Sequence, residues 1–332
     1  MKLAETLALF LGSAALIYLA CEFFVNGVEW VGWNFGFAQK ATGTILAAFG
    51  TALPESVVTF VAVVFGTTAE QRDVGVGAAV GGPLVLGTIA YAVVGWVVIW
   101  RGRRGRDARL SIDHRHLSRD QGWFLLIFAA KIALGLVAFA GKPWLGAPFL
   151  LAYAAYFWTE TRGRRDEAEG ALEPLKLRPR DSRPATPWVL LQTGGALVVI
   201  FAACRVFVNQ LNVLGPLSGM PPQLVALLLS PVATELPEIL NAVIWVRQGK
   251  ERLALANISG AMMIQATVPT AFGIFFTPWM LDRALIWAAA VTGTSVLTLF
   301  LSFRRGSMSG SALSSFGAFY AVFALGLLVL GR

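Results

Sequence analysis

Residues 49–58 read FGTALPESVV, which places Pro54 and Glu55 inside an apolar run from Ile45 to Phe65. Proline removes a backbone hydrogen-bond donor and disrupts the preceding helical turn. A carboxylate within an apolar helix is costly and is usually retained for a function. The stretch therefore predicts a break in a buried helix at which a charged group is needed.

The composition is that of a helical membrane protein. The chain has 332 residues, of which 56% are hydrophobic and 14% charged, whereas soluble domains carry about 25% charged residues. Apolar runs of about 20 residues are long enough to cross roughly 30 Å of hydrocarbon, and an outer-membrane barrel would instead show alternating strands of about ten residues. We predict an all-α polytopic membrane protein with ten transmembrane helices near residues 5–28, 42–66, 74–100, 121–141, 143–161, 187–209, 222–247, 252–276, 281–302 and 311–331.

The basic residues predict the orientation of these spans. If the N-terminus lies outside, the inner side carries 20 Lys and Arg residues and the outer side carries five. Basic residues concentrate in inner loops, so both termini are expected outside, and the net charge of +8 reflects this bias rather than a nucleic-acid surface. No large loop domain and no cleavable targeting segment is evident, so we expect a multi-pass protein of a prokaryotic inner (plasma) membrane.

The chain contains an internal repeat. ACEFFVN at 20–26 matches ACRVFVN at 203–209 in five of seven positions, at an offset of 183, and the same offset aligns GTALPE at 50–55 with ATELPE at 233–238. Each copy spans five predicted helices, so the second copy enters the membrane from the opposite side, as in many secondary transporters. We divide the chain into a first repeat (1–161), a cytoplasmic linker (162–186) and a second repeat (187–332).

The two Pro-Glu elements predict a cation site near the membrane midplane. The repeat axis would bring Glu55 and Glu238 together, and the proline kinks would free carbonyl groups near Thr51 and Thr234. Irregular backbone is tolerated at this depth where it lines a polar cavity. Glu235 lies one helical turn before Glu238 and adds a third carboxylate. Such a set of hard oxygen ligands suits calcium.

The two elements resemble the alpha-repeats of the calcium/cation antiporter superfamily, which includes sodium/calcium and proton/calcium exchangers. The signature of that family is close to G-T-S-x-P-E in both halves, and the resemblance covers nearly the whole chain. It implies ten spans in a five-plus-five inversion. It also implies that calcium is bound by the Glu55 and Glu238 carboxylates and by the carbonyl groups of Thr51 and Thr234.

The chain departs from the third-helix pattern of that family, which is close to G-N-V-I-G-S-N-I-x-N. The two corresponding stretches read GAAVGGPLVL (77–86) and ANISGAMMIQ (256–265). Gly82 and Ala261 replace the serines, Leu86 replaces the final Asn of the first copy, and Gln265 occupies that position in the second. The site has thus lost neutral oxygen ligands and gained Glu235. Since clustered carboxylates repel one another, Glu235 is expected to serve as a third cation ligand or as a proton carrier.

We therefore expect a secondary antiporter that exchanges Ca²⁺, or a similar divalent cation, for Na⁺ or H⁺ by alternating access. It is expected not to be an enzyme and to hold no resident cofactor; its partners are inorganic cations and the lipid bilayer. Two alternatives stay open: a non-transporting scaffold or sensor with the same fold, and an intramembrane hydrolase that uses two carboxylates as acid and base. The metal ligands predicted are Thr51, Glu55, Thr234, Glu235, Glu238 and Gln265.

Two further charges lie at equivalent positions of the repeat. Glu22 and Arg205 are again 183 residues apart, and both lie inside predicted spans. One hypothesis is an ion pair between them that joins the first and sixth helices; the alternative is that each side chain extends to its own membrane interface. Lys131 stands alone in the fourth predicted span, and the sequence assigns it no role.

Overall fold

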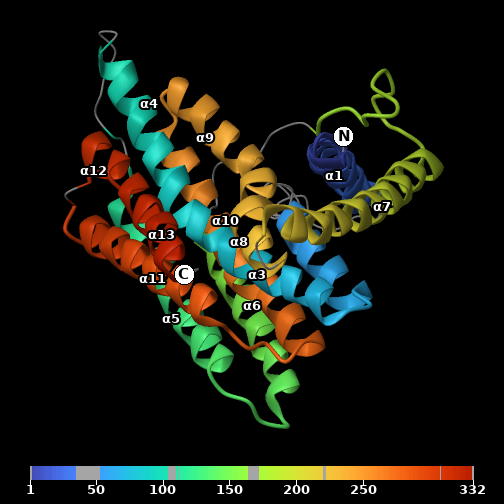
Figure 1. Cartoon of the computed structure of the whole chain (residues 1–332). Coiled ribbons are helices and arrows are strands. Elements are labelled where there is room, and N and C mark those ends of the chain that lie inside the picture. Colours follow the sequence, from blue (N-terminus) through green and yellow to red (C-terminus); the bar gives the residue numbers. More distant parts are fainter. Residues whose placement is uncertain are drawn as a thin grey trace.

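The computed structural model describes residues 2–34, 53–103, 110, 112–163, 172–219, 222–306 and 308–330, and these residues form helices and connecting loops without any strand (Figure 1). Within this described part, six helical segments are long and apolar enough to cross a membrane: Leu3–Val31, Ala69–Gly102, Thr186–Leu217, Glu251–Phe276, Arg283–Arg304 and Gly310–Leu327. The prediction of an all-helical, multi-pass membrane protein is confirmed. The number of spans and the side on which the termini lie stay predictions.

The helices of the first half begin with α1 (Lys2–Asn34) and a shorter apolar helix, Leu53–Phe65. They continue with α3 (Ala69–Val85), which passes through a π-helical turn, η1 (Leu86–Ala90), into α4 (Tyr91–Arg103). They end with α5 (His114–Gly135), the 3₁₀ turn η2 (Lys142–Leu145) and α6 (Gly146–Gly163). The helix α5 begins before residue 121, in the segment predicted to connect the spans 74–100 and 121–141. The Asp113 carboxylate caps this helix by accepting a 3.0 Å hydrogen bond from the His116 N–H.

The second half contains α7 (Thr186–Ser218), α8 (Pro222–Thr234), α9 (Leu236–Arg247) and α10 (Glu251–Phe276). It ends with α11 (Arg283–Arg304), α12 (Gly310–Ser314) and α13 (Gly317–Leu330). The helix break predicted at the second Pro-Glu element is present between α8 and α9. Pro237 lies in the first turn of α9 and offers no N–H to the helix before it, so α8 ends at Thr234.

The interior is divided into two main hydrophobic clusters. The larger joins α3, α4, α5, α10 and α11, and the smaller joins α1, α7, α8 and the Leu53–Phe65 helix. In Figure 1, α1 and α7 lie together at one side of the molecule, away from α5 and α11. Phe10 and Phe207 stack at the α1–α7 contact with ring centroids 4.7 Å apart. The helices α1 and α7 thus pack mainly within the smaller hydrophobic cluster.

The two clusters meet where α3 and α8 approach closely. A Cβ atom at Gly81 would lie 2.6 Å from Pro231 Cγ and 2.7 Å from the Leu227 carbonyl oxygen. Only a glycine allows this backbone approach without displacement of α8. The approach holds the break between α8 and α9 against the middle of α3.

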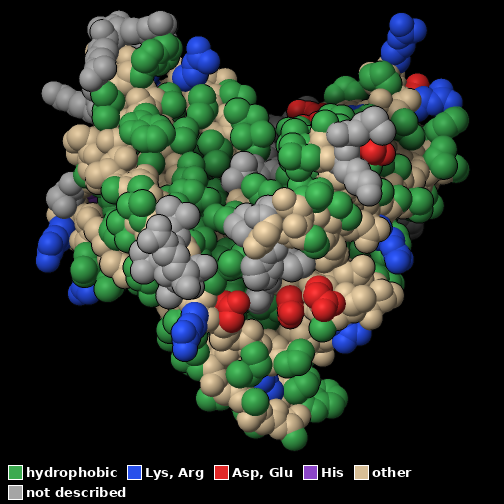
Figure 2. All heavy atoms as spheres, viewed as in Figure 1, with side chains coloured by type: hydrophobic (Ala, Val, Ile, Leu, Met, Phe, Trp, Pro, Cys, Tyr) green, Lys and Arg blue, Asp and Glu red, His purple; other side chains and the backbone are tan. Residues whose placement is uncertain are grey.

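The outer surface is largely apolar. Figure 2 shows hydrophobic side chains over most of one face, which is hollowed at its upper edge between the part with α4 and α9 and the part with α1 and α7. Leu11 on α1 and Val198 on α7 are 61% and 68% exposed. In a soluble protein such a surface would aggregate, whereas in a bilayer it is covered by lipid.

The described part of the predicted linker packs along α1 and α7. Leu175 is fully buried, and the Trp30 indole N–H donates a 3.0 Å hydrogen bond to the Glu173 carbonyl oxygen. The Lys176 ammonium lies 3.2 Å from the Glu22 carboxylate. The predicted Glu22–Arg205 pair is therefore wrong. The sequence could not show that the linker folds back onto α1 and offers Glu22 a nearer cation.

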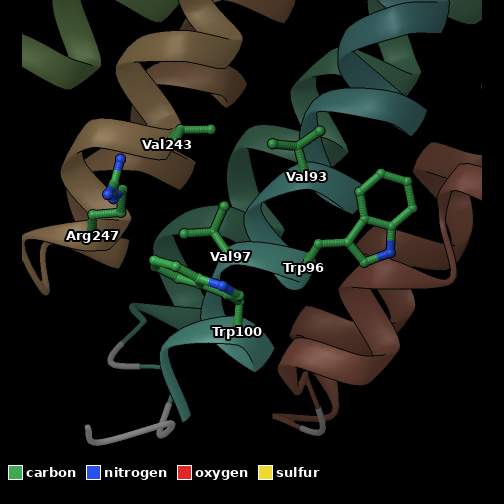
Figure 3. Close-up of a pocket in the computed structure, with 6 residues that line it drawn as sticks. All are labelled: Val93, Trp96, Val97, Trp100, Val243 and Arg247. Carbon is green, nitrogen blue, oxygen red and sulfur yellow. The ribbon is translucent and has the colours of Figure 1, made fainter. Parts of the chain in front are cut away.

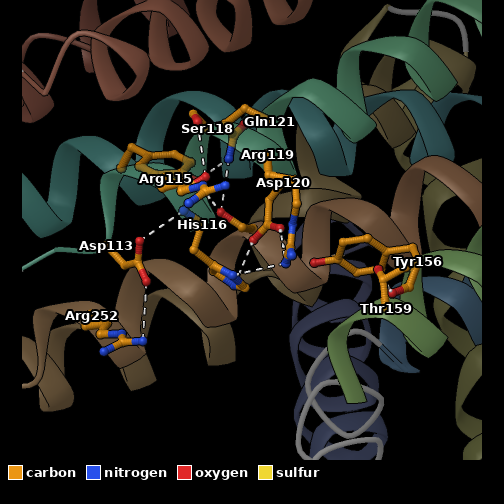
Figure 4. A network of polar contacts seen from close by, with 12 residues as sticks. Asp113, Arg115, His116, Ser118, Arg119, Asp120, Gln121, Tyr156, Thr159 and Arg252 are labelled. Carbon is orange, nitrogen blue, oxygen red and sulfur yellow. Dashed lines mark hydrogen bonds and ion pairs between the residues drawn. The ribbon is translucent and has the colours of Figure 1, made fainter. Parts of the chain in front are cut away.

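A second set of charged groups lies at the end of α4 and at the starts of α5 and α10. Arg101 of α4 forms a buried ion pair with Glu251 in the first turn of α10, and it also donates to the Val246 carbonyl oxygen at 2.7 Å. Figure 4 shows the neighbouring contacts, in which Asp113 lies 3.4 Å from Arg252. We call this set the inner ion-pair network: Arg101, Asp113, His116, Arg119, Asp120, Glu251 and Arg252.

Candidate cation site

The two Pro-Glu elements meet inside the protein. Glu55 lies near the start of the Leu53–Phe65 helix, and its side chain has no exposed surface. Thr234, the last residue of α8, donates a hydrogen bond from its hydroxyl to Glu55 Oε2 at 2.5 Å. This contact joins residues 179 positions apart in the chain. The juxtaposition of the two Pro-Glu elements, which the internal repeat predicted, is thus present.

Glu235 and Gln265 form the second link of the cluster. Glu235 stands at the break between α8 and α9, and Gln265 lies in the middle of α10; both are fully buried. The Gln265 amide N–H donates to Glu235 Oε1 at 2.6 Å. An amide can orient a carboxylate in this way while its own carbonyl oxygen remains available to a cation.

Gly82 of α3 makes room for this link. A Cβ atom at this position would lie 2.7 Å from Gln265 Oε1 and 3.4 Å from Glu235 Oε1. The space next to the α3 backbone is therefore filled by an amide from α10. Gly82 and Gln265 thus share one space, because the Gln265 amide occupies the volume that a side chain at position 82 would need.

The hydroxyl of Thr234 is surrounded by acceptors. Besides Glu55 Oε2, it lies 2.9 Å from the Ser230 carbonyl oxygen and 3.5 Å from Glu235 Oε1. A hydroxyl carries one proton, so it cannot satisfy three acceptors well. Among the described residues, no hydrogen-bond partner is found for the buried oxygens Glu55 Oε1, Glu235 Oε2 and Gln265 Oε1. The cluster thus offers more hydrogen-bond acceptors than the described donors satisfy.

Glu238 lies in the first turn of α9 and is also fully buried. Its carboxylate interacts electrostatically with that of Glu235, as does the carboxylate of Glu55. Nevertheless, within the described residues no three His, Cys, Asp or Glu side chains are gathered closely enough to hold a metal ion. Thr51 lies outside the described residues. Cation binding by the six predicted ligands therefore stays a prediction.

One buried charge near the cluster has no counterpart in the predicted ligand set. Lys131 of α5 is fully buried, and its ammonium donates to the Ala79 carbonyl oxygen of α3 at 3.0 Å. The ammonium also interacts electrostatically with the Glu55 carboxylate. A lone lysine in an apolar span was the sequence signal, but only the structure shows that its side chain reaches from α5, which packs on α10 and α11, to the backbone of α3.

The surface groove between α4 and α9 is not part of this cluster. Figure 3 shows Trp96 and Trp100 on α4 and Arg247 at the end of α9, with the Arg247 guanidinium 5.5 Å from the centroid of the Trp100 ring. None of the six residues that line the groove is acidic: Val93, Trp96, Val97, Trp100, Val243 and Arg247. A cation would find no ligand there, so the buried carboxylates are the candidate site.

Two curated relatives resemble the chain over most of its length. The inner membrane protein YrbG of Escherichia coli (strain K12) is 25% identical over 286 residues, which cover 83% of this chain and 82% of that protein. The putative antiporter CaxA of Alkalimonas amylolytica is 22% identical over 316 residues, which cover 92% of each.

Solved exchanger structures share the fold. The crystal structure of the H⁺/Ca²⁺ exchanger CAX superposes with a TM-score of 0.67 at 18% identity, over 98% of this chain and 88% of that one. The sodium-calcium exchanger NCX_Mj, soaked with 100 mM Na⁺ and 10 mM Sr²⁺, superposes with a TM-score of 0.60 at 18% identity, over 96% of each chain. The sodium/calcium exchanger protein family matches residues 5–161 and 188–330. The chain therefore belongs to the sodium/calcium exchanger protein family.

Proposed function

We propose that this membrane cation antiporter exchanges Ca²⁺, or a similar divalent cation, for H⁺ or Na⁺ at the buried carboxylate cluster. The observation that carries the proposal is the hydrogen bond from Thr234 to Glu55, because it joins the two Pro-Glu elements inside the protein. Glu55 and Glu238 supply the charge that binds the divalent ion. The Thr234 and Gln265 oxygens complete its surroundings, together with the predicted ligand Thr51.

Glu235 is proposed as the third acidic ligand or as the proton carrier. It is buried between Gln265 and the other carboxylates, and the loss of neutral oxygens at Gly82 and Ala261 leaves few ligands for several sodium ions. A carboxylate that can bind either a proton or the divalent ion makes the two ions compete. Such competition supports proton coupling over sodium coupling.

The proposed access route involves α1 and α7. These two helices pack mainly on each other and on their own hydrophobic cluster, so the pair can slide with little disturbance of the larger bundle. We also infer that the two repeats are inverted, that both termini lie outside, and that the membrane is the inner (plasma) membrane. The family match falls into two segments separated by the predicted linker, which supports the division into repeats.

The test is ion flux in proteoliposomes that contain the purified chain. Calcium uptake is followed under an imposed pH gradient and, separately, under a sodium gradient. We expect the pH gradient to drive uptake and the Glu235→Gln variant to lose this dependence. Uptake driven by sodium and indifferent to pH would contradict the proton coupling. No cation movement under either gradient would favour the scaffold or sensor alternative. In that case, the hydrolase alternative would be tested separately by a substrate assay.

A further inference from the structure

The surface groove between α4 and α9 is apolar at one end and positively charged at the other. It has a volume of about 350 Å³. Its lining residues recur every three or four positions along the two helices: Val93, Trp96, Val97, Trp100, Val243 and Arg247. Figure 3 shows Val243 across the groove from Val93, and Arg247 across from Trp100. The groove therefore runs along the helix axes and ends at the Arg247 guanidinium.

The charge of Arg247 is not neutralised by the described part of the protein. Its side chain is exposed, and its guanidinium lies 5.5 Å from the centroid of the Trp100 ring. A ring face attracts a cation but carries no net charge. Among the described residues, no carboxylate forms an ion pair with Arg247. The nearby Arg101, by contrast, is buried and paired with Glu251.

The surface around the groove is suited to contact with lipid. Trp96 and Trp100 are exposed on α4, and Leu240 and Ile244 are exposed on α9. The helical segment that contains α4, Ala69–Gly102, is long and apolar enough to cross a membrane. Tryptophan gathers at membrane interfaces, and arginine side chains extend from apolar surfaces toward the polar headgroups. The charged end of the groove is thus expected at headgroup level.

We propose that this groove binds one anionic phospholipid, with an acyl chain between Val93 and Val243 and the phosphate at Arg247. The occupant has to be apolar along the groove and negatively charged at its end, and an anionic phospholipid is both. A second copy of the chain would bring further basic loops to Arg247, and a zwitterionic phospholipid would bring a positive charge together with its phosphate. The groove lies outside the carboxylate cluster, so the proposal goes beyond the proposed exchange and does not depend on it.

The test compares phospholipids on the purified full chain in detergent micelles. Phosphatidylglycerol and phosphatidylcholine with the same acyl chains are titrated separately, and apparent affinities are taken from the rise of the unfolding temperature, since a ligand of the folded state stabilises it. We expect the wild-type chain to prefer phosphatidylglycerol on the order of tenfold, the effect of one hydrogen bond between charged groups. Arg247→Gln should lose most of this preference.

Arg304→Gln is the matched control. Arg304 is also exposed, stands at the end of α11 and lies 6.0 Å from the centroid of the Phe300 ring, but it does not line the groove. This variant should keep the wild-type preference for phosphatidylglycerol. Glycerol phosphate, which has the phosphate but no acyl chain, should leave the unfolding temperature unchanged at the same concentrations, because the apolar groove contributes to binding.

Four results would overturn the inference. The first is a wild-type chain stabilised equally by the two phospholipids. The second is an Arg247→Gln variant that prefers phosphatidylglycerol as strongly as Arg304→Gln does. The third is stabilisation by glycerol phosphate equal to that by phosphatidylglycerol, which would mean that the groove takes up no acyl chain. The fourth is a wild-type dimer in detergent that dissociates on Arg247→Gln, which would assign the groove to a second copy of the chain.

Discussion

The buried carboxylate cluster (Glu55, Glu235 and Glu238) and the inner ion-pair network both remove charged side chains from water, but they balance those charges differently. In the network, Arg101 faces Glu251, and each side chain is less than a tenth exposed. In the cluster, Glu55, Glu235 and Glu238 are all fully buried beside a single lysine. In the network, charges of opposite sign face each other, whereas acidic groups predominate in the cluster. Such a surplus of negative charge is what the proposed transport site requires and a structural contact does not.

The two regions also differ in how the backbone supports them. Glu251 and Arg101 project from unbroken helical turns at the start of α10 and near the end of α4. Thr234, Glu235 and Glu238 stand at a break between two helices, which Pro237 maintains by offering no N–H. A broken helix exposes carbonyl oxygens that a bound cation can use, and a continuous helix does not.

The largest expected effect is loss of transport when a carboxylate of the cluster is neutralised. Glu55→Gln and Glu238→Gln should each reduce calcium flux in proteoliposomes to background, because the divalent ion loses one of the carboxylates proposed to bind it. Glu22→Gln is the matched control, since Glu22 is partly exposed and pairs with Lys176. Equal flux in the control and in the cluster variants, at equal amounts of folded protein, would refute the site.

Disruption of the inner network should change stability rather than transport chemistry. Arg101→Met leaves Glu251 buried without its cation, which is expected to lower the free energy of unfolding by about 3 kcal/mol. Unfolding of the purified chain in detergent measures this change. The double variant Arg101→Met/Glu251→Leu should recover most of the loss, because no uncompensated charge remains. A double variant as unstable as the single one would show that the pair contributes through packing instead.

A smaller effect is expected at the fitted pair of Gly82 and Gln265. Gly82→Ala places a methyl group where the Gln265 amide now lies, so that amide must move away from Glu235. Because the two residues share one space, Gly82→Ala and Gln265→Ala should be non-additive, with a coupling of about 1 kcal/mol in unfolding measurements. Additive changes in the free energy of unfolding would mean that the position of the Gln265 amide does not depend on Gly82. Gly260→Ala is a control, since a Cβ atom there meets nothing within 4 Å.

The smallest expected effect is a pH dependence of stability that arises from Asp113 at the start of α5. The His116 backbone N–H, with help from Arg252, holds the pKa of Asp113 below its ordinary value. Because the pKa is lower in the folded state, the ionised carboxylate stabilises the fold at every pH above the unfolded-state pKa of about 3.9. This contribution to stability is lost as the pH falls through the lower pKa of the folded state. The carboxylate is about a third exposed, so solvent screening keeps the contribution small.

Asp113→Asn isolates this contribution, because asparagine still caps the helix but carries no charge. The wild-type chain should unfold at a slightly higher temperature than the variant at pH 7, and the difference should shrink as the pH is lowered below about 3.9. A difference that stays constant on acidification would mean that the cap, rather than the charge, is what the substitution altered.

Much of the architecture was predictable because it depends on local composition and on repetition. Long apolar runs predict helices that span a membrane, and a proline followed by a glutamate predicts a break with a charge beside it. The offset of 183 residues predicted that the two Pro-Glu elements would meet, and the hydrogen bond between Thr234 and Glu55 joins them. The prediction for Glu22 failed because symmetry between repeats says nothing about the linker, which the repeat does not include.

The sequence by itself determined that this protein is a polytopic membrane protein of the exchanger family, with acidic groups beside two helix breaks. Only the tertiary structure decided which side chains complete the cluster. Gln265 fills the space left by Gly82 because α10 packs against α3 at that point, and the Lys131 ammonium reaches the α3 backbone at Ala79 from α5. Local patterns fix where a helix breaks, but the neighbours of a buried charge depend on contacts between segments far apart in the chain.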